Sequence, residues 1–211
     1  MSAHRVVIAG GGVAGLEALI ALRELAGDAV SITLLSPSRE FTIRALSVQE
    51  PFAKPSARIY DVGAICADHG AELRHDALEA VHRETRTITT MSGEELVYDS
   101  LLVAIGARPS PAFPHVTTFR GVQDAEAMHG LLQDVEGGWS SSVAFVVPPG
   151  TTWPLPIYEL ALMTAERAEG LGLSPQITVV TPEHAPLGLF GEEASRRVDD
   201  QLSERGIIVR T

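Results

Sequence analysis

Along the chain, short runs of apolar residues alternate with longer segments in which apolar residues recur at helical spacing. The front of the chain predicts a strand over residues 5–9, a helix over 13–26 and a strand over 30–35. Residues 37–56 are rich in proline and serine and predict no regular element, whereas 58–69 has a helical pattern.

A cluster of short strands follows. Residues 77–82, 85–91 and 95–98 each predict a strand, and the turn Ser92-Gly93 separates the last two, which indicates a small antiparallel meander. Residues 101–105 are apolar throughout, so we expect them to form a buried parallel strand.

Beyond a proline-rich stretch, helices and strands alternate regularly. The predicted helices span 124–135, 155–169 and 192–205, and the predicted strands span 143–147, 177–181 and 207–209. This β-α-β-α-β pattern is the half-unit of a nucleotide-binding fold with a parallel sheet and right-handed crossovers. We therefore predict an α/β protein with a Rossmann-like domain and meander over 1–109, a connection over 110–120 and a second, incomplete Rossmann-like domain over 121–211.

A glycine-rich turn lies between the first predicted strand and helix. The segment Gly10-Gly11-Gly12-Val13-Ala14-Gly15 fits the GxGxxG pattern, in the context that this pattern requires. Gly10 permits a tight turn, Gly12 lets a pyrophosphate approach the backbone and Gly15 allows close packing of helix on strand. We predict that Gly10, Gly12, Val13, Ala14 and Gly15 bind a dinucleotide, whose charge the helix amino terminus attracts. A glycine turn without a ligand is the alternative.

The end of the second strand departs from the usual dinucleotide pattern. An acidic residue is expected there to hold the ribose, and the chain has Ser36, which cannot accept two hydroxyl groups as a carboxylate does. Ser38 and Arg39 are candidates to hold a 2′-phosphate, so an NADP-type cofactor stays open. A solvated turn is the simpler interpretation of these two residues.

Composition and charge narrow the range of functions. The chain has 211 residues, is 45% hydrophobic and 20% charged, and carries a formal net charge of −11 without a cluster of lysine and arginine. These values are typical of a globular domain and argue against nucleic acid or an anionic membrane surface as a partner. No apolar stretch approaches the roughly 20 residues of a transmembrane helix, and no signal-like segment precedes the first strand, so we expect a cytoplasmic protein.

The potential metal and thiol ligands show no site pattern. The seven histidines lack the spacing of metal ligands, so we expect no metal site. Cys66 is the single cysteine, it lies in a helical run, and no CxxC accompanies it. We interpret it as a buried structural thiol and expect no dithiol redox centre within these residues.

A second motif carries a resemblance to a known family. Residues 98–109 read YDSLLVAIGARP, and together with the Gly10–Gly15 turn this segment resembles the pyridine nucleotide–disulfide oxidoreductase superfamily, in particular the group of sulfide:quinone oxidoreductases, flavocytochrome c sulfide dehydrogenases and type II NADH dehydrogenases. Ile105 replaces the usual threonine. The resemblance implies a Rossmann-like FAD-binding domain at the front of the chain, with Ala104, Ile105 and Gly106 along the flavin.

The same resemblance implies further cofactor contacts. Residues 41–46 are similar to the segment after the second strand in that group, which implies that Arg44 lies near FAD, although a solvated arginine is an equal alternative. Ala77 and Leu78, where the meander begins, are also implied to contact the cofactor.

The second predicted domain departs from the family in its glycine turn. Within residues 147–156 only Gly150 remains, and several prolines remove N–H donors that a pyrophosphate would need, which argues against NAD(P)H binding there. The redox cysteine that family members carry near this turn is replaced by Thr152 or Trp153, so the sequence does not support cysteine-based sulfide chemistry. Trp153 is the better of the two tryptophans as a site residue.

These observations predict an FAD-dependent oxidoreductase. Electrons would pass from a small reductant through the flavin to an acceptor, with a quinone and NAD(P)H among the candidate substrates. An NADP-dependent reductase using the first glycine turn, and a nucleotide-binding module without turnover, are the alternatives. No side chain is identified as an acid, base or nucleophile. Family members continue beyond residue 211, so we expect a fragment that retains FAD weakly or not at all, and a homodimer is one candidate assembly.

Overall fold

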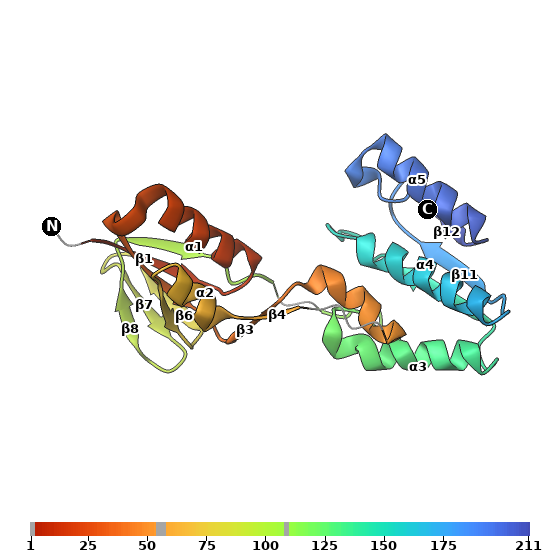
Figure 1. The fold of residues 1–211 in the computed structure, drawn as a ribbon, viewed down its shortest axis with the longest axis horizontal. Coiled ribbons are helices and arrows are strands. Elements are labelled where there is room, and N and C mark those ends of the chain that lie inside the picture. The colour runs from red at the N-terminus through yellow and green to blue at the C-terminus, as the bar shows by residue number, and fades with distance from the viewer. Residues whose placement is uncertain (1–2, 54–57, 108–109) are drawn as a thin grey trace. The chain divides into compact units, whose positions relative to one another are not determined.

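The computed structural model describes residues 3–53, 58–107 and 110–211, which form two compact units (Figure 1). The first unit comprises Met1–Thr42 and Arg58–Pro109, and the second comprises Ile43–Ala57 and Ser110–Thr211. Residues 54–57 of the predicted irregular segment, and the last two residues of the 98–109 motif, lie outside the described residues.

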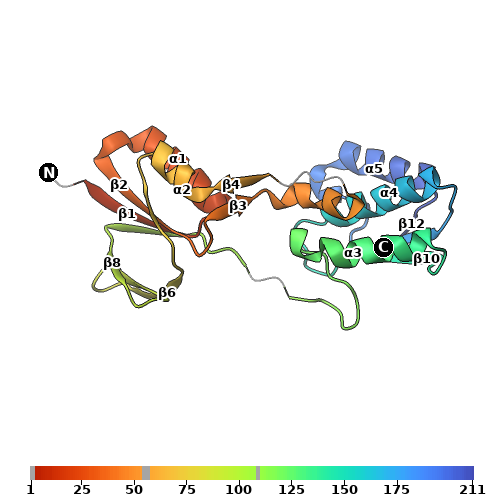
Figure 2. The ribbon, with the colours of Figure 1, turned by 60° about the horizontal axis from the view of Figure 1, so that its bottom comes forward.

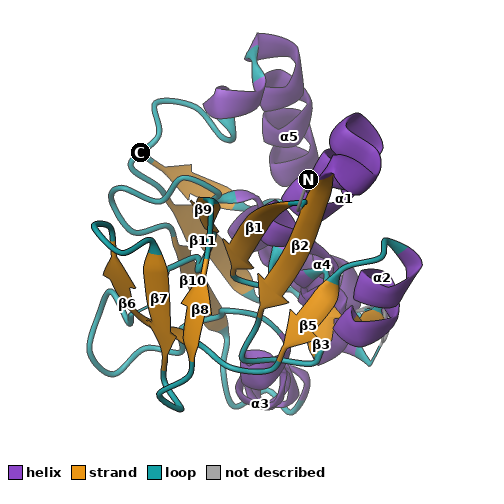
Figure 3. Cartoon of the chain, turned by 90° about the vertical axis from the view of Figure 1, so that its left-hand side faces the viewer, coloured by secondary structure: helices purple, strands orange, loops and turns teal. Residues whose placement is uncertain are grey.

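A parallel four-stranded sheet forms the centre of the first unit. Its strand order is β5-β2-β1-β9, with bounds Glu72–Arg74, Val30–Leu35, His4–Ala9 and Ser100–Val103. Strands β1, β2 and β5 lie side by side and point the same way in Figure 3. In this register Ala9 is the partner of both Leu35 and Val103, so the three strands end together and their following loops share one edge of the sheet.

Both faces of this sheet are covered. Side chains of one face, including Ile8 and Leu34, pack in a core with residues of helices α1 (Val13–Ala26) and α2 (Val62–Asp68). The other face packs on the predicted antiparallel meander, whose strands are β6 (Leu78–His82), β7 (Thr87–Thr90) and β8 (Glu95–Val97). Burial on both sides explains why residues 6–9 of β1 are apolar throughout.

Three predictions for this unit were wrong. Residues 101–105 were expected to be buried, but β9 is an edge strand of the described sheet, with Leu102 37% and Val103 53% exposed. Residues 58–69 begin with a strand, β4 (Ile59–Asp61), which pairs with another unpredicted strand, β3 (Glu40–Thr42). Helix α2 starts only after β4, because the Asp61 carboxylate accepts a hydrogen bond from the Ala64 N–H at 2.8 Å and caps the helix.

The second unit contains the predicted β-α-β-α-β pattern. Strands β10 (Ser142–Val146), β11 (Gln176–Val180) and β12 (Ile208–Arg210) form a parallel sheet in that order. Helices α4 (Leu155–Gly170) and α5 (Glu192–Glu204) make the two crossovers, and α3 (Ala125–Glu136) precedes β10. Short 3₁₀ helices occur at Gly27–Ala29 (η1), Val122–Asp124 (η3) and Gly188–Phe190 (η4).

A segment predicted to be irregular belongs to this second unit. Residues Arg44–Phe52 form a 3₁₀ helix, η2, which lies beside α3 (Figure 2). Val48 and Phe52 of η2 are buried in the core of the second unit, and the His129 ring donates a hydrogen bond to the Pro51 carbonyl oxygen at 2.8 Å. The structure therefore groups residues 43–53 with the second unit, whereas the sequence led us to expect one continuous first domain over 1–109.

Of the helices in the described parts of the chain, none combines the length and the apolar character needed to cross a bilayer.

Candidate functional site

Two glycines of the GxGxxG turn are required by packing. Gly10 has φ +121°, and a Cβ atom on it would lie 2.1 Å from the Ala104 carbonyl oxygen. A Cβ atom on Gly15 would lie 1.8 Å from the Gly10 carbonyl oxygen, so α1 starts directly against the turn. Larger residues at either position would force the backbone apart.

Gly12 differs from these two glycines. It is the N-cap residue of α1 in an extended conformation, and a Cβ atom on it would meet nothing within 4 Å. No side chain caps α1, and its first turn contains no acidic residue. The first N–H groups of a helix have no partner within the helix and carry partial positive charge. The space above Gly12 is therefore suited to an anion such as a pyrophosphate.

Ser36 lies next to the glycine turn. A Cβ atom on Gly11 would be 2.4 Å from the Ser36 hydroxyl oxygen, and the Ser36 N–H donates to the carbonyl oxygen of Arg74 at the end of β5. The Ser36 side chain is buried, and its hydroxyl donates to the Ser38 carbonyl oxygen at 2.7 Å. The Ser38 hydroxyl in turn donates to the Glu40 carbonyl oxygen at 2.8 Å. Both hydroxyl groups considered for a ribose or a 2′-phosphate thus already have local partners.

Asp99 of the second motif has a structural role. The Asp99 carboxylate accepts hydrogen bonds from the Arg5 backbone N–H at 2.8 Å and from its guanidinium at 2.9 and 3.1 Å. The Arg5 guanidinium holds the pKa of Asp99 well below its usual range. These contacts fasten the start of β9 to β1, so the end of β9 meets the glycine turn.

Ala104, Ile105 and Gly106 follow β9 at this edge. The Ala104 N–H donates to the Ala9 carbonyl oxygen at 2.7 Å. Ile105 is 64% exposed and Val13, at the start of α1, is 62% exposed. Exposed apolar side chains beside an open helix terminus provide contact area for a ligand that has both a charged and an apolar part.

Ala77 lies in the loop after β5, and Leu78 is the first residue of β6. The Ala77 N–H donates to the Asp76 carboxylate at 2.8 Å and its carbonyl oxygen accepts from the Met91 N–H at 2.9 Å. The Ser92 hydroxyl also donates to Asp76 and lowers the pKa of that carboxyl. Because these groups are already paired, the structure provides no free backbone N–H at Ala77 for a cofactor.

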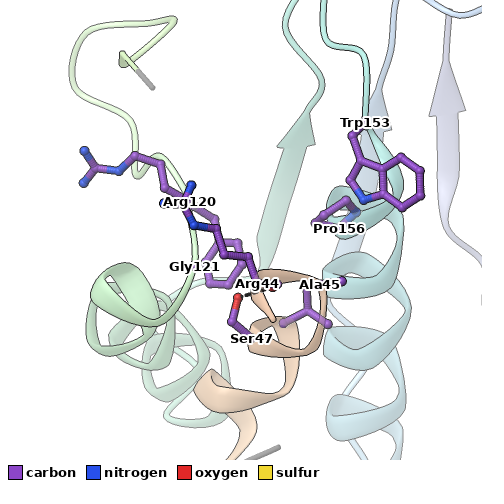
Figure 4. Close-up of a pocket in the computed structure, with 9 residues that line it drawn as sticks. Arg44, Ala45, Ser47, Arg120, Gly121, Trp153 and Pro156 are labelled. Atoms are coloured by element: carbon purple, nitrogen blue, oxygen red, sulfur yellow. Dashed lines mark hydrogen bonds between the residues drawn. The ribbon is translucent and has the colours of Figure 1, made fainter. Parts of the chain in front are cut away.

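Arg44, the remaining predicted residue, belongs to the second unit, where it lines a pocket of about 180 Å³ (Figure 4). The lining comes from η2, from the segment before η3 and from the start of α4, and consists of Arg44, Ala45, Ser47, Val48, Phe119, Arg120, Gly121, Trp153 and Pro156. The predicted contact between Arg44 and FAD stays a prediction.

The sequence indicated Trp153 but not the residues opposite it. Trp153 is half-exposed, and its ring packs edge-on against Phe190 at a centroid distance of 5.2 Å. Arg120 is fixed by Asp124, whose carboxylate accepts from the Arg120 guanidinium at 2.6 and 3.0 Å, and this contact lowers the pKa of Asp124. Nothing in the local sequence around residues 119–121 could have placed them beside Trp153, because the pocket forms only when η2 and α4 pack together.

Glu183 and Cys66 are two further reactive side chains of the described residues. Glu183, after β11, accepts hydrogen bonds from the hydroxyls of Tyr158 at 2.7 Å and Thr181 at 3.1 Å. Burial is the main cause that raises the pKa of Tyr158 to about 12. Cys66 is buried, and burial raises the pKa of its thiol, as expected for a structural cysteine. In the described ranges, no three His, Cys, Asp or Glu side chains gather in a way that could hold a metal ion.

Comparisons with known proteins identify relatives of this chain. The chain is 28% identical over 218 residues to a sulfide-quinone reductase of Aquifex aeolicus, covering 97% of this chain and 50% of the relative. The crystal structure of the sulfide:quinone oxidoreductase from the same bacterium matches with a TM-score of 0.83 and 26% identity, over 99% of this chain and 50% of the other.

The structure of an NDH2 of Plasmodium falciparum in complex with NADH matches with a TM-score of 0.75 and 16% identity, over 100% of this chain and 48% of the other. This match supports the fold. The chain thus spans about half the length of these relatives. A family profile described as pyridine nucleotide-disulphide oxidoreductase matches residues 4–211, and the chain belongs to this family.

Proposed function

We propose that this protein is an FAD-dependent oxidoreductase, in which electrons pass from a small-molecule donor through the flavin to an acceptor such as a quinone. The observation that carries the proposal is the open, uncapped amino end of α1 at Gly12, beside the exposed apolar residues that follow β9. Membership of the family and the likeness to a sulfide-quinone reductase support the same assignment.

The residues at the sheet edge fit the parts of FAD. The backbone N–H groups of Val13 and Ala14 would hold the pyrophosphate over Gly12, where a side chain would obstruct it. Ile105 and Gly106 would flank the flavin. The ribose would lie near Ser36, whose hydroxyl already donates to the Ser38 carbonyl oxygen. When bound, FAD supplies the redox chemistry, and the protein positions it and tunes its surroundings.

The side chains also limit the donor chemistry. Cys66 is the single cysteine of the chain and is buried, so we do not propose a reaction through a pair of cysteines. In the turn between β10 and α4, the Thr151 N–H donates to the Pro148 carbonyl oxygen at 3.2 Å, and Pro154 is the N-cap residue. These features leave few donors for a second pyrophosphate, so a smaller reductant than NAD(P)H fits this turn better.

The test uses protein expressed from its complete reading frame. We expect one flavin per chain by absorbance, bleaching of that absorbance by a reductant under anaerobic conditions, and its recovery after a water-soluble quinone is added. Sulfide, NADH and NADPH are compared as reductants. A colourless protein that binds NADPH would instead establish the NADP-dependent alternative, and a protein that binds a nucleotide but is reduced by none of the three would support the module without turnover.

A further inference from the structure

The loop that follows β11 in the second unit has the same turn as the loop that follows β2 in the first. In each, a buried hydroxyl residue, Thr181 or Ser36, comes directly after the strand and before a proline. The Thr181 N–H donates to the Arg210 carbonyl oxygen at the end of β12 at 2.9 Å, and the Ser36 N–H donates to the Arg74 carbonyl oxygen at the same distance. A dinucleotide-binding unit holds the ribose at the end of its second strand, so Thr181 marks that position in the second unit.

The second unit has at this turn the carboxylate that the first unit lacks. Glu183 lies two residues beyond Thr181, and an acidic side chain is what holds the ribose hydroxyls in a dinucleotide-binding unit. Its Oε2 atom already accepts hydrogen bonds from the hydroxyls of Tyr158 at 2.7 Å and Thr181 at 3.1 Å. A carboxylate oxygen has two acceptor positions, so Oε2 has none left for a ribose hydroxyl. The two hydroxyls of a ribose therefore cannot both be held.

The contact between Tyr158 and Glu183 is protected from water. Tyr158 lies on α4 and is 1% exposed, and Thr181 is 3% exposed. Burial is the main cause that raises the pKa of Tyr158 to about 12, so its hydroxyl keeps its proton and remains a donor at neutral pH. A hydrogen bond from a hydroxyl to a carboxylate is about twice as strong as one between neutral groups. A ribose that is already solvated by water has little to gain by displacing it.

We propose that Tyr158 determines the choice of reductant, because its hydroxyl occupies the Glu183 carboxylate that the ribose of NAD(P)H would need. This inference rests on the proposed function for its consequence, which is that a reductant smaller than NAD(P)H reduces the flavin. The contact itself lies within the second unit and involves neither the first glycine turn nor the prolines after β10. It adds a specific side chain to the features that exclude a dinucleotide from this unit.

Adenosine is the probe, because it carries the ribose and no phosphate, and so does not depend on the N–H donors that the turn after β10 lacks. Tyr158→Phe removes the hydroxyl and keeps the ring. The protein is expressed from its complete reading frame and saturated with FAD, so that the first glycine turn is occupied. In titrations followed by saturation-transfer NMR, we expect wild type to show no saturation up to about 10 mM adenosine and Tyr158→Phe to bind with a Kd of about 1 mM. A gain of at least about tenfold is the effect of one charge-assisted hydrogen bond.

Three controls assign this gain to the ribose and to Glu183. The double variant Tyr158→Phe/Glu183→Gln should lose the gain, because the amide cannot accept two hydroxyls as a carboxylate does. 2′-Deoxyadenosine, which lacks one of the two hydroxyls, should bind to Tyr158→Phe about tenfold more weakly than adenosine. Tyr60→Phe removes a hydroxyl of the first unit that has no partner among the described residues, and it should behave as wild type. Equal adenosine affinity in wild type and Tyr158→Phe, or a gain that persists in the double variant, overturns the proposal.

Flavin content, measured by absorbance on the same samples, separates this inference from the proposed function. A protein that holds no flavin, but in which Tyr158→Phe gains adenosine binding through Glu183, contradicts the proposed function and leaves this inference standing. A flavoprotein in which wild type and Tyr158→Phe bind adenosine equally overturns this inference alone. Urea unfolding of each variant confirms that it is folded before its affinity is compared.

Discussion

The substitution Gly12→Ala should reduce FAD binding without unfolding the protein. Gly12 is extended at φ −86°, which alanine adopts freely, and its Cβ would meet nothing within 4 Å. The methyl group would instead occupy the space in which we expect the pyrophosphate. The variant therefore separates a glycine needed for a ligand from one needed for the fold.

The expected stability change is small. Alanine is a poorer N-cap residue than glycine by several tenths of a kcal/mol, but it also lowers the entropy of the unfolded chain by about 0.4–1 kcal/mol. These effects oppose each other, so the free energy of unfolding should change by less than about 0.5 kcal/mol. Displacing the pyrophosphate would cost one charge-assisted hydrogen bond, about 1.5–3 kcal/mol, which weakens FAD binding about 10- to 150-fold.

The assay is a titration with FAD that follows quenching of flavin fluorescence, combined with urea unfolding of the ligand-free protein. Gly130→Ala is the matched control, because Gly130 lies inside α3 and its Cβ would also meet nothing within 4 Å. We expect this control to gain about 1 kcal/mol of stability and to bind FAD normally. FAD affinity that is unchanged in Gly12→Ala would refute the assignment of the glycine turn to the pyrophosphate.

Three further substitutions test the packing around the two sites. Gly15→Ala should lower the free energy of unfolding by about 3 kcal/mol, measured with urea, because the new Cβ would lie 1.8 Å from the Gly10 carbonyl oxygen. Asp124→Asn should destabilise the protein by about 1–2 kcal/mol at neutral pH through weaker hydrogen bonds from Arg120. Because the folded pKa of Asp124 is lowered, the difference from wild type should be constant above about pH 5 and shrink as the pH falls below about 4. Tyr158→Phe should cost about 1 kcal/mol, since it removes a buried hydroxyl that donates to a carboxylate.

The last two of these substitutions have a matched control in the chain. Asp200→Asn removes an exposed ion pair and should cost less than about 0.5 kcal/mol. Tyr60→Phe removes a hydroxyl for which the described residues offer no partner, so its effect should be close to zero. Equal effects of Tyr60→Phe and Tyr158→Phe would contradict the hydrogen bond from Tyr158 to Glu183. A pH-independent effect of Asp124→Asn would contradict the contact between Asp124 and Arg120. Wild-type stability of Gly15→Ala would contradict the close packing of Gly15 on Gly10.

Local patterns were sufficient to predict which loops of the first unit meet at one edge of the sheet. The turn Gly10–Gly15 and the segment around Ala104 each lie directly after an apolar strand, and parallel strands bring such loops to one edge. The sequence could not show that the hydroxyl of Ser36 is already bound within its own turn. That contact depends on the backbone conformation of residues 36–38. Pro37 allows this conformation, but the sequence alone does not determine it.

Tertiary packing decided what the sequence missed. Strand β5 is three residues long, which is too short for a clear pattern. Residues 44–52 contain few apolar positions, and Val48 and Phe52 of η2 are buried only by packing in the core of the second unit. The pocket beside it joins segments that are far apart in the chain. Arg44 was therefore noticed through the resemblance to a family, while Arg120 carried no signal at all.

The three motif glycines do not provide equal evidence for function. Gly10 and Gly15 are each explained by a backbone oxygen about 2 Å from a would-be Cβ, and a turn without any ligand would require them just as strictly. Gly12 has no such neighbour, and packing gives no reason for the absence of a side chain there. A GxGxxG match therefore indicates a ligand only when its middle glycine faces open space at an uncapped helix terminus. Gly12 of this chain meets that condition.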